Sequence, residues 1–341
     1  MKKLSLEERI LKLITKSGKQ GILQTHLVST LGYSRSYISE TLKKMENNGI
    51  IKRERENPFQ LRIYLSDSEK KNNRHFTVGL LVSSEYIFVI AALRKIARKY
   101  GITVRFKLYK NTTRLNEDAI AGKIQVILSP TLNQLIMSLT SDSISMLRPI
   151  ATGGSFIVEN KEGKNDLNIS SSSSTMILMM RKFLDGRGKS EIRRMEDAAK
   201  SIDLIKNGSY KRIAIWEPYA SSLLLEKNCV ISASYREILG NFPCCFICTT
   251  HTFGRDMPEI VSLIGDEYDA EIENMNLREK EVAWAIGLIS TKTGIPIPLV
   301  ERSLGNYNFK IKYSREELLD FIEELKIYLT TEQIESLFGK E

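Results

Sequence analysis

From about residue 75 onward, segments with the residue pattern of β-strands alternate with segments that have the pattern of α-helices. The strand-like segments are short apolar runs, such as residues 78–82 and 124–129. The segments that follow them carry apolar side chains at helical spacing, as in residues 84–100 and 131–139. Strands that alternate with helices build a mostly parallel sheet covered by helices on both faces. We therefore predict an α/β fold for the larger part of the chain.

A second α/β segment follows the first, so two lobes are expected. Its predicted strands and helices are residues 166–169, 176–184, 196–207, 212–216 and 244–249. Farther on, the pattern predicts two helices within 258–293, a strand near 308–313 and a helix at 315–328. In open α/β sheets, ligands bind in the crevice beyond the carboxyl ends of the strands. A ligand site is therefore expected where the strand-end loops meet.

Near the N-terminus, residues 34–48 have the pattern of an amphipathic helix. Ile38, Leu42 and Met45 recur at helical spacing and share one face. Ser34 is suited to cap the helix by accepting a hydrogen bond from a free amide of the first turn. The opposite face is polar and basic, which fits the major groove of DNA, where Arg, Ser and Lys reach base edges and phosphates. An ordinary solvent-facing helix surface is the alternative interpretation.

The segments around this helix are arranged as in a helix-turn-helix unit. Residues 5–8 fit a capping box at the start of a first helix, and residues 21–32 predict a second helix that ends at a glycine. Residues 50–55 and 61–65 predict a two-stranded ribbon. In this order, residues 4–65 resemble the winged helix-turn-helix domain of bacterial and archaeal regulators of the MarR-like class.

This resemblance implies double-stranded DNA as a partner. The implied DNA-binding residues are Arg35, Ser36, Ser39, Lys43, Lys44, Lys52, Arg53, Arg55 and Arg62. Residues 1–75 hold 16 Lys and Arg against 8 Asp and Glu, while the whole chain has a net charge of +9. Most of the positive excess therefore lies where neutralisation of phosphates would supply affinity. We also predict a homodimer, since such regulators match a two-fold protein to pseudo-palindromic half-sites.

The length of 341 residues fits two or three domains. We predict a winged helix-turn-helix domain at 1–66, a polar linker at 67–74, a two-lobed effector-binding domain at 75–330 and a C-terminal helix or tail at 331–341. No run of 18 apolar residues is present, so no membrane span is expected. The first residues lack the apolar core of an export signal, and the four cysteines do not suggest a disulfide framework. These features predict a cytoplasmic location.

The two-lobed part also resembles a known family. The run AGKIQVILSPTLNQL at 121–135 is similar to a helix–Gly–strand segment of type 2 periplasmic-binding folds. The phrase GSYKRIAIWEPYASSLLLEK at 208–227, with MPEIV at 257–261, resembles the second lobe of the nitrate, sulfonate and thiamin-precursor binding proteins of ABC importers. The resemblance covers about residues 76–330. It implies a fold class of α/β type, with a small winged-helix (α+β) N-terminal domain and a two-lobed, type 2 periplasmic-binding-like C-terminal domain.

Candidate ligand contacts lie at the predicted strand ends. They are mainly hydroxyl groups, which together with free helix amides can hold an anion, and two aromatic side chains, which can stack on a ring. The predicted ligand-binding residues are Ser83, Ser84, Ser129, Thr131, Ser171, Ser172, Ser173, Ser174, Thr175, Trp216, Glu217 and Tyr219. For the hydroxyl-rich run, a plain surface loop is the alternative. For Trp216 and Glu217, the alternatives are core packing and an exposed carboxylate.

The stretch Pro-Cys-Cys-Phe-Ile-Cys at 243–248 resembles the CCCFC stretch of the fungal thiamin-pyrimidine synthases, which share this fold and are linked to iron. Ile247 interrupts the match. On a strand, Cys244 and Cys248 would lie about 13 Å apart at ~3.3 Å per residue, while Cys245 would point to the other face. We therefore interpret the three cysteines as small buried side chains. No metal site, cofactor or catalytic residue is predicted.

These observations together predict a ligand-responsive DNA-binding transcription regulator that senses a small polar or anionic metabolite between its lobes. The plan resembles LysR-type regulators, but a short polar linker replaces their long dimerising helix. The alternative is an enzyme of the thiamin-pyrimidine synthase type with an appended DNA-binding domain. The scattered histidines and the lack of an assembled acid–base group disfavour that enzyme.

Overall fold

The computed structural model describes residues 5–47, 50–57, 60–66, 75–141, 143–163, 166–171, 174–187, 191–324 and 330–338. The chain forms two compact units, one made mainly of residues 1–75 and the other of most residues from 76 to 341. The predicted linker at 67–74 lies outside the described residues.

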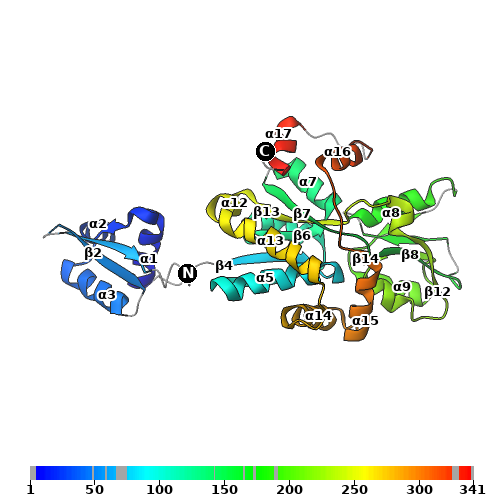
Figure 1. Ribbon diagram of the computed structural model, residues 1–341, viewed down its shortest axis with the longest axis horizontal. Helices are drawn as coiled ribbons and strands as arrows, with labels where there is room; N and C mark the ends of the chain where they lie inside the picture. The colour runs from blue at the N-terminus through cyan, green and yellow to red at the C-terminus, as the bar shows by residue number, and fades with distance from the viewer. Residues whose placement is uncertain are drawn as a thin grey trace. The chain divides into compact units, whose positions relative to one another are not determined.

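The first unit contains three helices and a small antiparallel sheet (Figure 1). Its elements are α1 (Leu6–Ser17), η1 (Gly18–Gln20), β1 (Ile22–Leu23), α2 (Gln24–Leu31), α3 (Arg35–Asn47), β2 (Ile51–Asn57) and β3 (Gln60–Leu65). The strands pair in the order β1-β3-β2. This arrangement brings the short strand before α2 onto the free edge of the β2–β3 ribbon, a pairing that the sequence pattern did not predict.

The local signals in this unit are confirmed by its packing. Ser5 and Glu8 form a capping box at the start of α1, and the Tyr37 amide donates to Ser34 Oγ at 3.2 Å at the start of α3. Apolar side chains spaced along the helices meet in one core. The fully buried members of that core include Ile10, Ile14, Leu27, Ile38, Leu42, Met45 and Ile63.

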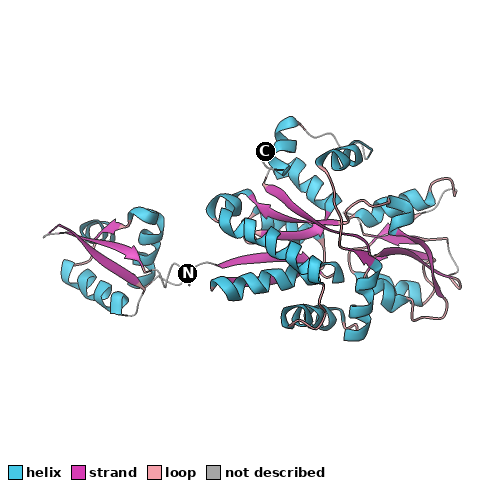
Figure 2. Cartoon of the chain, in the orientation of Figure 1, coloured by secondary structure: helices cyan, strands magenta, loops and turns pink. Residues whose placement is uncertain are grey.

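The second unit is built on two mixed sheets flanked by helices (Figure 2). The first sheet, in the order β14-β7-β13-β6-β4-β5, consists of β4 (His75–Leu81), β5 (Thr103–Tyr109), β6 (Val126–Pro130), β7 (Ile144–Gly153), β13 (Cys245–Thr250) and β14 (Tyr307–Asn308). The second sheet, in the order β10-β9-β11-β8-β12, consists of β8 (Ser155–Asn160), β9 (Asn168–Ser170), β10 (Ile192–Arg194), β11 (Arg212–Trp216) and β12 (Cys229–Ser234). Each sheet is the centre of one lobe.

Helices connect most of these strands. In chain order they are η2 (Ser84–Tyr86), α5 (Ile87–Tyr100), α6 (Thr112–Ile120), α7 (Thr131–Ser141), α8 (Thr175–Leu184), α9 (Ala198–Lys206), α10 (Tyr219–Leu223), α11 (Tyr235–Leu239), α12 (His251–Asp256), α13 (Pro258–Asn274), α14 (Lys280–Thr293), α15 (Ile297–Ser303), η3 (Leu304–Asn306), α16 (Arg315–Glu324) and α17 (Thr331–Phe338). Among the described residues, no single helix is long and apolar enough to span a membrane, although the bent pair Lys280–Thr293 and Ile297–Asn306 passes on length and composition together.

The expectation of mostly parallel sheets is wrong. β4 and β6 are parallel, but β13 pairs antiparallel with both β6 and β7, and β8 pairs antiparallel with β11 and β12. The reason lies in how the chain changes lobes. It runs directly from β7 into β8, and no long crossover helix returns it to the end at which β7 began. A strand that follows another without such a crossover enters its sheet from the opposite end, so it pairs antiparallel with its neighbours.

Gly153 and Gly154 form the first crossing between the lobes. Both have positive φ, at 84° and 64°, a conformation that favours glycine. A Cβ on Gly153 would stand 2.8 Å from the Asn306 carbonyl oxygen, and a Cβ on Gly154 would collide with the Tyr307 ring. The pair is therefore required by the close approach of η3 and β14. β14 is only two residues long, much shorter than the strand expected near 308–313.

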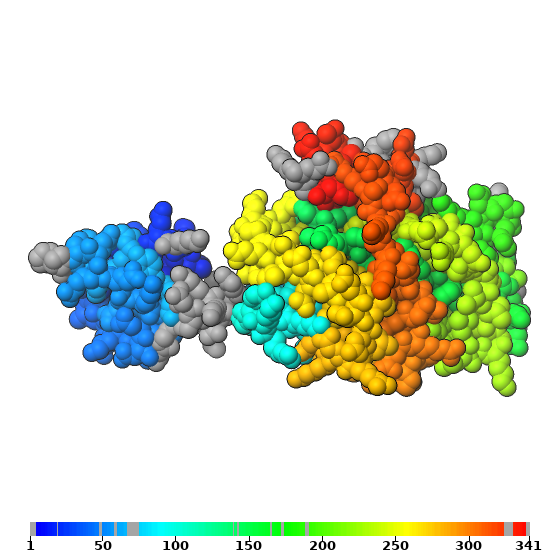
Figure 3. All heavy atoms as spheres, in the orientation of Figure 1, coloured from blue at the N-terminus to red at the C-terminus, as the bar shows by residue number. Residues whose placement is uncertain are grey.

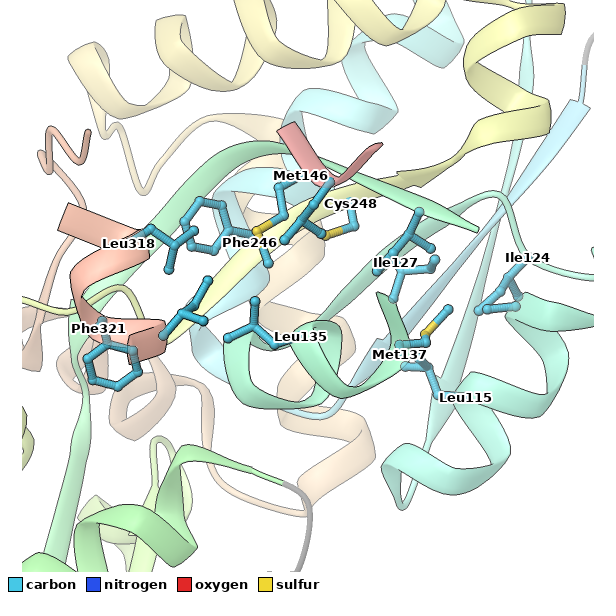
Figure 4. Packing of buried hydrophobic residues seen from close by; sticks show 14 of the residues in the cluster. Leu115, Ile124, Ile127, Leu135, Met137, Met146, Phe246, Cys248, Leu318 and Phe321 are labelled. Carbon is cyan, nitrogen blue, oxygen red and sulfur yellow. The ribbon is translucent and has the colours of Figure 1, made fainter. Parts of the chain in front are cut away.

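After β14 the chain leads into α16 along the surface of the second unit. Figure 3 shows this part as an orange ridge that continues from α15 toward α16. The α16 helix then packs apolar side chains against the first sheet. Figure 4 shows Leu318 from this helix next to Phe246 from β13, while Phe321, Leu135 from α7 and Cys248 from β13 belong to the same cluster. One apolar cluster thus joins the C-terminal segment to the first lobe.

Candidate functional site

A cavity of about 380 Å³ lies within the second unit, where loops from both sheets meet. That volume falls in the usual range of small-molecule pockets. The wall combines aromatic rings, hydroxyls, carboxyls and thiols with the side chains of two lysines, Lys110 and Lys292. Its polar and aromatic members include Ser83, Glu85, Tyr86, Tyr109, Asn111, Ser171, Ser174, Thr175, Glu196, Asp197, Trp216, Tyr219, Cys244 and Cys245.

Half of the predicted ligand residues lie on this wall, and they come from strand ends of both lobes. They are Ser83, Ser171, Ser174, Thr175, Trp216 and Tyr219. Ser174 also caps α8, because its hydroxyl accepts a hydrogen bond from the Met176 amide at 3.2 Å. Ser172 and Ser173 fall outside the described residues. Whether the wall residues contact a ligand stays a prediction.

Four other predicted residues are fully buried and use their polar atoms inside the protein. Ser84 accepts a hydrogen bond from the Ser303 hydroxyl, and Ser129 accepts one from the Asn133 amide. Thr131 donates to the carbonyls of Pro243 and Cys244 at 2.8 and 3.0 Å. These three side chains therefore position strand ends and loops behind the cavity wall.

Glu217 is the fourth, and it sits at the junction of the two lobes. Its side chain is 0 % exposed and accepts hydrogen bonds from the Ser221 amide at 2.9 Å, the Ser221 hydroxyl at 2.8 Å and the Asn306 amide at 2.5 Å. Its backbone oxygen accepts from the Ser84 amide at 3.2 Å. Burial raises the pKa of Glu217, and its donors oppose that shift. Sequence reasoning assigned this carboxylate to the cleft because it could not show these internal donors.

The aromatic pair lies at the same junction. The Trp216 indole N–H donates to the Val82 carbonyl at 2.9 Å, which ties the end of β11 to the segment after β4. Trp216 and Tyr219 meet edge to face, with ring centroids 5.8 Å apart. Burial raises the pKa of Tyr219 to about 12, so its hydroxyl stays protonated near neutral pH. A half-buried ring with a polar tip suits a cavity wall.

A buried carboxyl group of the cavity wall, that of Glu85, was not predicted from the sequence. Glu85 in η2 is 3 % exposed, and its Oε2 lies 3.1 Å from Cys245 Sγ. Its Oε1 is buried and has no hydrogen-bond partner among the residues that the structure describes. Cys244 Sγ lies beside this group, 3.5 Å from Thr175 Oγ1. The ligand atoms of Glu85, Cys244 and Cys245 all lie within 4.8 Å of one another.

The three cysteines of the 243–248 stretch therefore separate into two environments. Cys244 precedes β13, so the alternation of a strand does not apply to it, and it converges with Cys245 on the cavity. Cys248 lies in the apolar cluster of the first lobe (Figure 4). The interpretation as buried side chains is confirmed for all three, but it missed this convergence. A signal that could have found it is the polar run Ser-Ser-Glu at 83–85, directly after a buried strand.

Burial controls the protonation of this cluster. It raises the pKa of the Glu85 carboxyl well above its usual range, and the nearby Cys244 thiol raises it further. Burial also raises the pKa of the Cys245 thiol. A hydrogen bond from Cys245 lowers the pKa of Cys244.

In the first unit, the residues predicted to contact DNA fall into two groups. Four of the cations form ion pairs within the unit: Lys44 with Glu7 at 2.9 Å, Lys52 with Glu54 at 2.8 Å, Arg53 with Glu46 at 2.5 Å and Arg62 with Glu56 at 2.8 Å. The others are exposed or half-buried on α3 and β2: Arg35, Ser36, Ser39, Lys43 and Arg55. The net charge of residues 1–75 does not reveal that four of these cations are paired with carboxylates inside the unit.

No protein-family model and no curated protein matches this sequence. Solved structures do share its fold. The zinc-bound ligand-binding component of an ABC-type import system from Staphylococcus aureus has a TM-score of 0.63 at 11% identity, over 75% of this chain and 93% of that one. The alkanesulfonate-binding protein SsuA from Xanthomonas axonopodis pv. citri, bound to MOPS, has a TM-score of 0.59 at 14% identity, over 75% of this chain and 95% of that one. The periplasmic nitrate-binding protein NrtA from Synechocystis PCC 6803 has a TM-score of 0.59 at 10% identity, over 78% of this chain and 86% of that one.

Most of this chain therefore has a periplasmic-binding-protein fold with two mixed α/β sheets. The same comparisons overturn several predictions. The predicted DNA-binding transcription regulator is wrong, because the structures that share the fold are ligand-binding components of import systems. Double-stranded DNA as the partner is wrong on the same finding, and the homodimer on DNA falls with it. The cytoplasmic location is also contradicted, since NrtA is periplasmic.

Proposed function

We propose that the second unit is a solute-binding protein that holds a small polar molecule between its two lobes. The observation that carries this proposal is the cavity of about 380 Å³ where strand-end loops of both sheets meet. Its wall mixes aromatic surface with a few convergent polar groups, the usual composition of small-molecule sites. We also infer a binding protein and not an enzyme, since the cavity hydroxyls have no adjacent histidine to activate them among the described lining residues.

The chemistry of the wall favours a solute with both donors and acceptors. Ser171, Ser174 and Thr175 offer hydroxyls, while Glu85 offers an acceptor, Oε1, that none of the described residues uses. Trp216 and Tyr219 add apolar surface at the junction of the lobes. The known binding proteins of this fold support a small solute, and the periplasmic nitrate-binding protein supports a site of action outside the cytoplasm. Cell fractionation tests that location directly.

The two tryptophans of the chain provide a matched binding experiment. Trp216 lies on the cavity wall, whereas Trp284 lies on α14 with its ring 3.7 Å from the Arg94 guanidinium. In the Trp284→Phe variant, Trp216 is the sole tryptophan, and we expect a saturable emission change when a panel of small anions, amino acids and heterocycles is titrated. In the Trp216→Phe variant, the same solutes should leave the emission of Trp284 unchanged.

A second variant pair tests the hydroxyl groups. Ser171→Ala removes a cavity hydroxyl, while Ser138→Ala removes a buried hydroxyl that donates to the Leu135 carbonyl outside the cavity. Calorimetry with a solute found by fluorescence should show weaker binding for Ser171→Ala by about 1 kcal/mol and no change for Ser138→Ala. Two results would contradict the proposal: a Trp216 emission that no solute of the panel changes, or equal affinities of Ser171→Ala and Ser138→Ala for a solute that does change it.

We also infer that residues 5–66 have a winged-helix type of fold. The order of three helices followed by a β2–β3 ribbon, with β1 on the ribbon edge, supports this. The inference concerns the fold of this unit alone.

A further inference from the structure

We infer that Glu85, Cys244 and Cys245 form a binding site for a thiophilic divalent metal ion, of which Zn²⁺ is the probe. This inference goes beyond solute binding, because the metal can be tested without any solute. The first observation is the convergence of one carboxylate and two sulfur atoms within 4.8 Å of one another. The second is the buried Glu85 Oε1, which has no hydrogen-bond partner in the described part of the chain and belongs to a side chain that is 3 % exposed.

The three donors are delivered by well-packed elements. Glu85 is fixed at the start of η2, where its amide donates to Ser83 Oγ at 3.2 Å. Cys245 begins β13 in the middle of the first sheet, paired with β6 and β7. Cys244 is held from behind, since the Thr131 amide and hydroxyl both donate to its carbonyl. Little rearrangement is therefore needed to bring the three donor atoms onto one ion.

The surroundings of the donors favour a cation over a hydrogen-bonded network. Among the residues that the structure describes, no Lys, Arg or His forms an ion pair with Glu85. Tyr86 and Thr175 are the polar neighbours of the two sulfur atoms, at 3.2 and 3.5 Å. A buried carboxylate without a basic partner is unfavourable unless it is protonated or bound to a metal. A divalent ion would satisfy Oε1 and offset two of the three negative charges that the donors carry once their protons are released on binding.

The donor set selects the class of metal. Two thiolates and one carboxylate suit Zn²⁺ and its softer relatives, whereas Mg²⁺ and Ca²⁺ require oxygen ligands. Three protein ligands leave one position of a tetrahedral ion free. All three residues line the cavity, so that position faces the space proposed for the solute. Cys248 and Cys229 are buried elsewhere and provide matched controls.

The experiment titrates the reduced, metal-free full-length protein with Zn²⁺ by calorimetry and with Co²⁺ by absorption spectroscopy. We expect one equivalent of each metal and, for Co²⁺, the visible bands of a tetrahedral site with sulfur-to-cobalt charge transfer in the near ultraviolet. Cys244→Ser and Cys245→Ser should abolish the charge-transfer signal or weaken binding at least 100-fold. Glu85→Gln, which keeps size and shape, should weaken it at least tenfold. Cys248→Ser and Cys229→Ser should retain one equivalent.

Two results would overturn the inference. One is a folded wild-type protein that binds no Zn²⁺ or Co²⁺, and the other is binding that survives unchanged in Glu85→Gln and in both serine variants of the pair. Circular dichroism verifies that each variant is folded, and Glu85→Gln preserves the test where a serine variant does not fold. A Trp216 signal with a solute but no metal binding would reject the metal site and leave the proposed function intact.

Discussion

Two buried carboxylates of the second unit, Glu217 and Glu85, differ in what surrounds them. Both lie just beyond the end of a buried strand, and both are almost inaccessible to solvent. Glu217 receives three hydrogen bonds, from Ser221 and Asn306, and joins the two lobes. Glu85 has sulfur atoms as its neighbours, and one of its oxygens has no partner.

The difference separates a structural carboxylate from one that is available for binding. A buried acceptor that already receives its hydrogen bonds contributes to stability and has no capacity for a ligand. A buried acceptor without a donor is unfavourable in the free protein, and a ligand that satisfies it gains affinity. Glu217 should therefore affect folding when it is changed, and Glu85 should affect binding.

The largest expected effect follows from Glu217→Ala. The substitution leaves the Ser221 amide and the Asn306 amide without their acceptor at the lobe junction. We expect the free energy of unfolding to fall by about 2–4 kcal/mol, because these donors lose charge-assisted hydrogen bonds. Urea denaturation followed by circular dichroism measures this change. A loss below about 0.5 kcal/mol would mean that Glu217 is no more structural than Glu85.

The next largest effect is expected for Glu85→Gln, which should lower solute affinity and leave the stability of the fold almost unchanged. We expect the free energy of unfolding to stay within about 1 kcal/mol of wild type, since the variant removes no acceptor that the protein uses fully. Solute affinity should fall by about 1–3 kcal/mol, because a solute donor that binds Glu85 favours its ionised form and gains a charge-assisted hydrogen bond, whereas the Gln amide stays neutral. Fluorescence titration of Trp216 in the Trp284→Phe background gives the affinity. Unchanged affinity alongside lost stability would reverse the roles assigned to the two residues.

Asn306→Ala tests the role of Glu217 by removing one of its hydrogen-bond donors. It removes the hydrogen bond of 2.5 Å to Glu217 but leaves both Ser221 donors in place. We expect destabilisation of about 1 kcal/mol. In the Glu217→Ala background, the same substitution should have almost no further effect, since its acceptor is already gone. Additive losses in this double-mutant cycle would show that the two side chains act independently.

The smallest effect concerns Asp118, a carboxylate that is saturated like Glu217 but lies at the surface. Hydrogen bonds from Lys107, Lys123 and Tyr109 hold the pKa of Asp118 well below its usual range. A lowered pKa in the folded state means that this stabilisation is present above the ordinary pKa of Asp and is lost as the pH falls through the folded-state value. Asp118→Asn should therefore melt at a lower temperature than wild type at pH 7, and the gap should close in acid. A gap that widens at low pH would contradict this sign.

The sequence by itself was sufficient for many of the local elements and for the coarse class of the larger unit, a two-lobed α/β fold. Apolar side chains at helical spacing, as at Ile38, Leu42 and Met45, determine which helix face is buried, because the spacing alone places them on one side. Alternation of strand and helix patterns predicted the two lobes, and the run around Trp216 predicted the relation to periplasmic-binding proteins. The residue pattern did not predict strand direction, since antiparallel pairing of β13 depends on where the chain crosses between the lobes.

Only the tertiary structure decided which polar residues remain available to a ligand. Ser84, Ser129, Thr131 and Glu217 have the same chemistry as the residues of the cavity wall, but they lie behind that wall, and their polar atoms are hydrogen-bonded inside the protein, most of them to segments far away in the chain. The carboxyl of Glu85 meets the thiols of Cys244 and Cys245 across about 160 residues of sequence, a separation that no local spacing can encode. Residue type sets what a side chain can bind, and packing sets whether that capacity is already used.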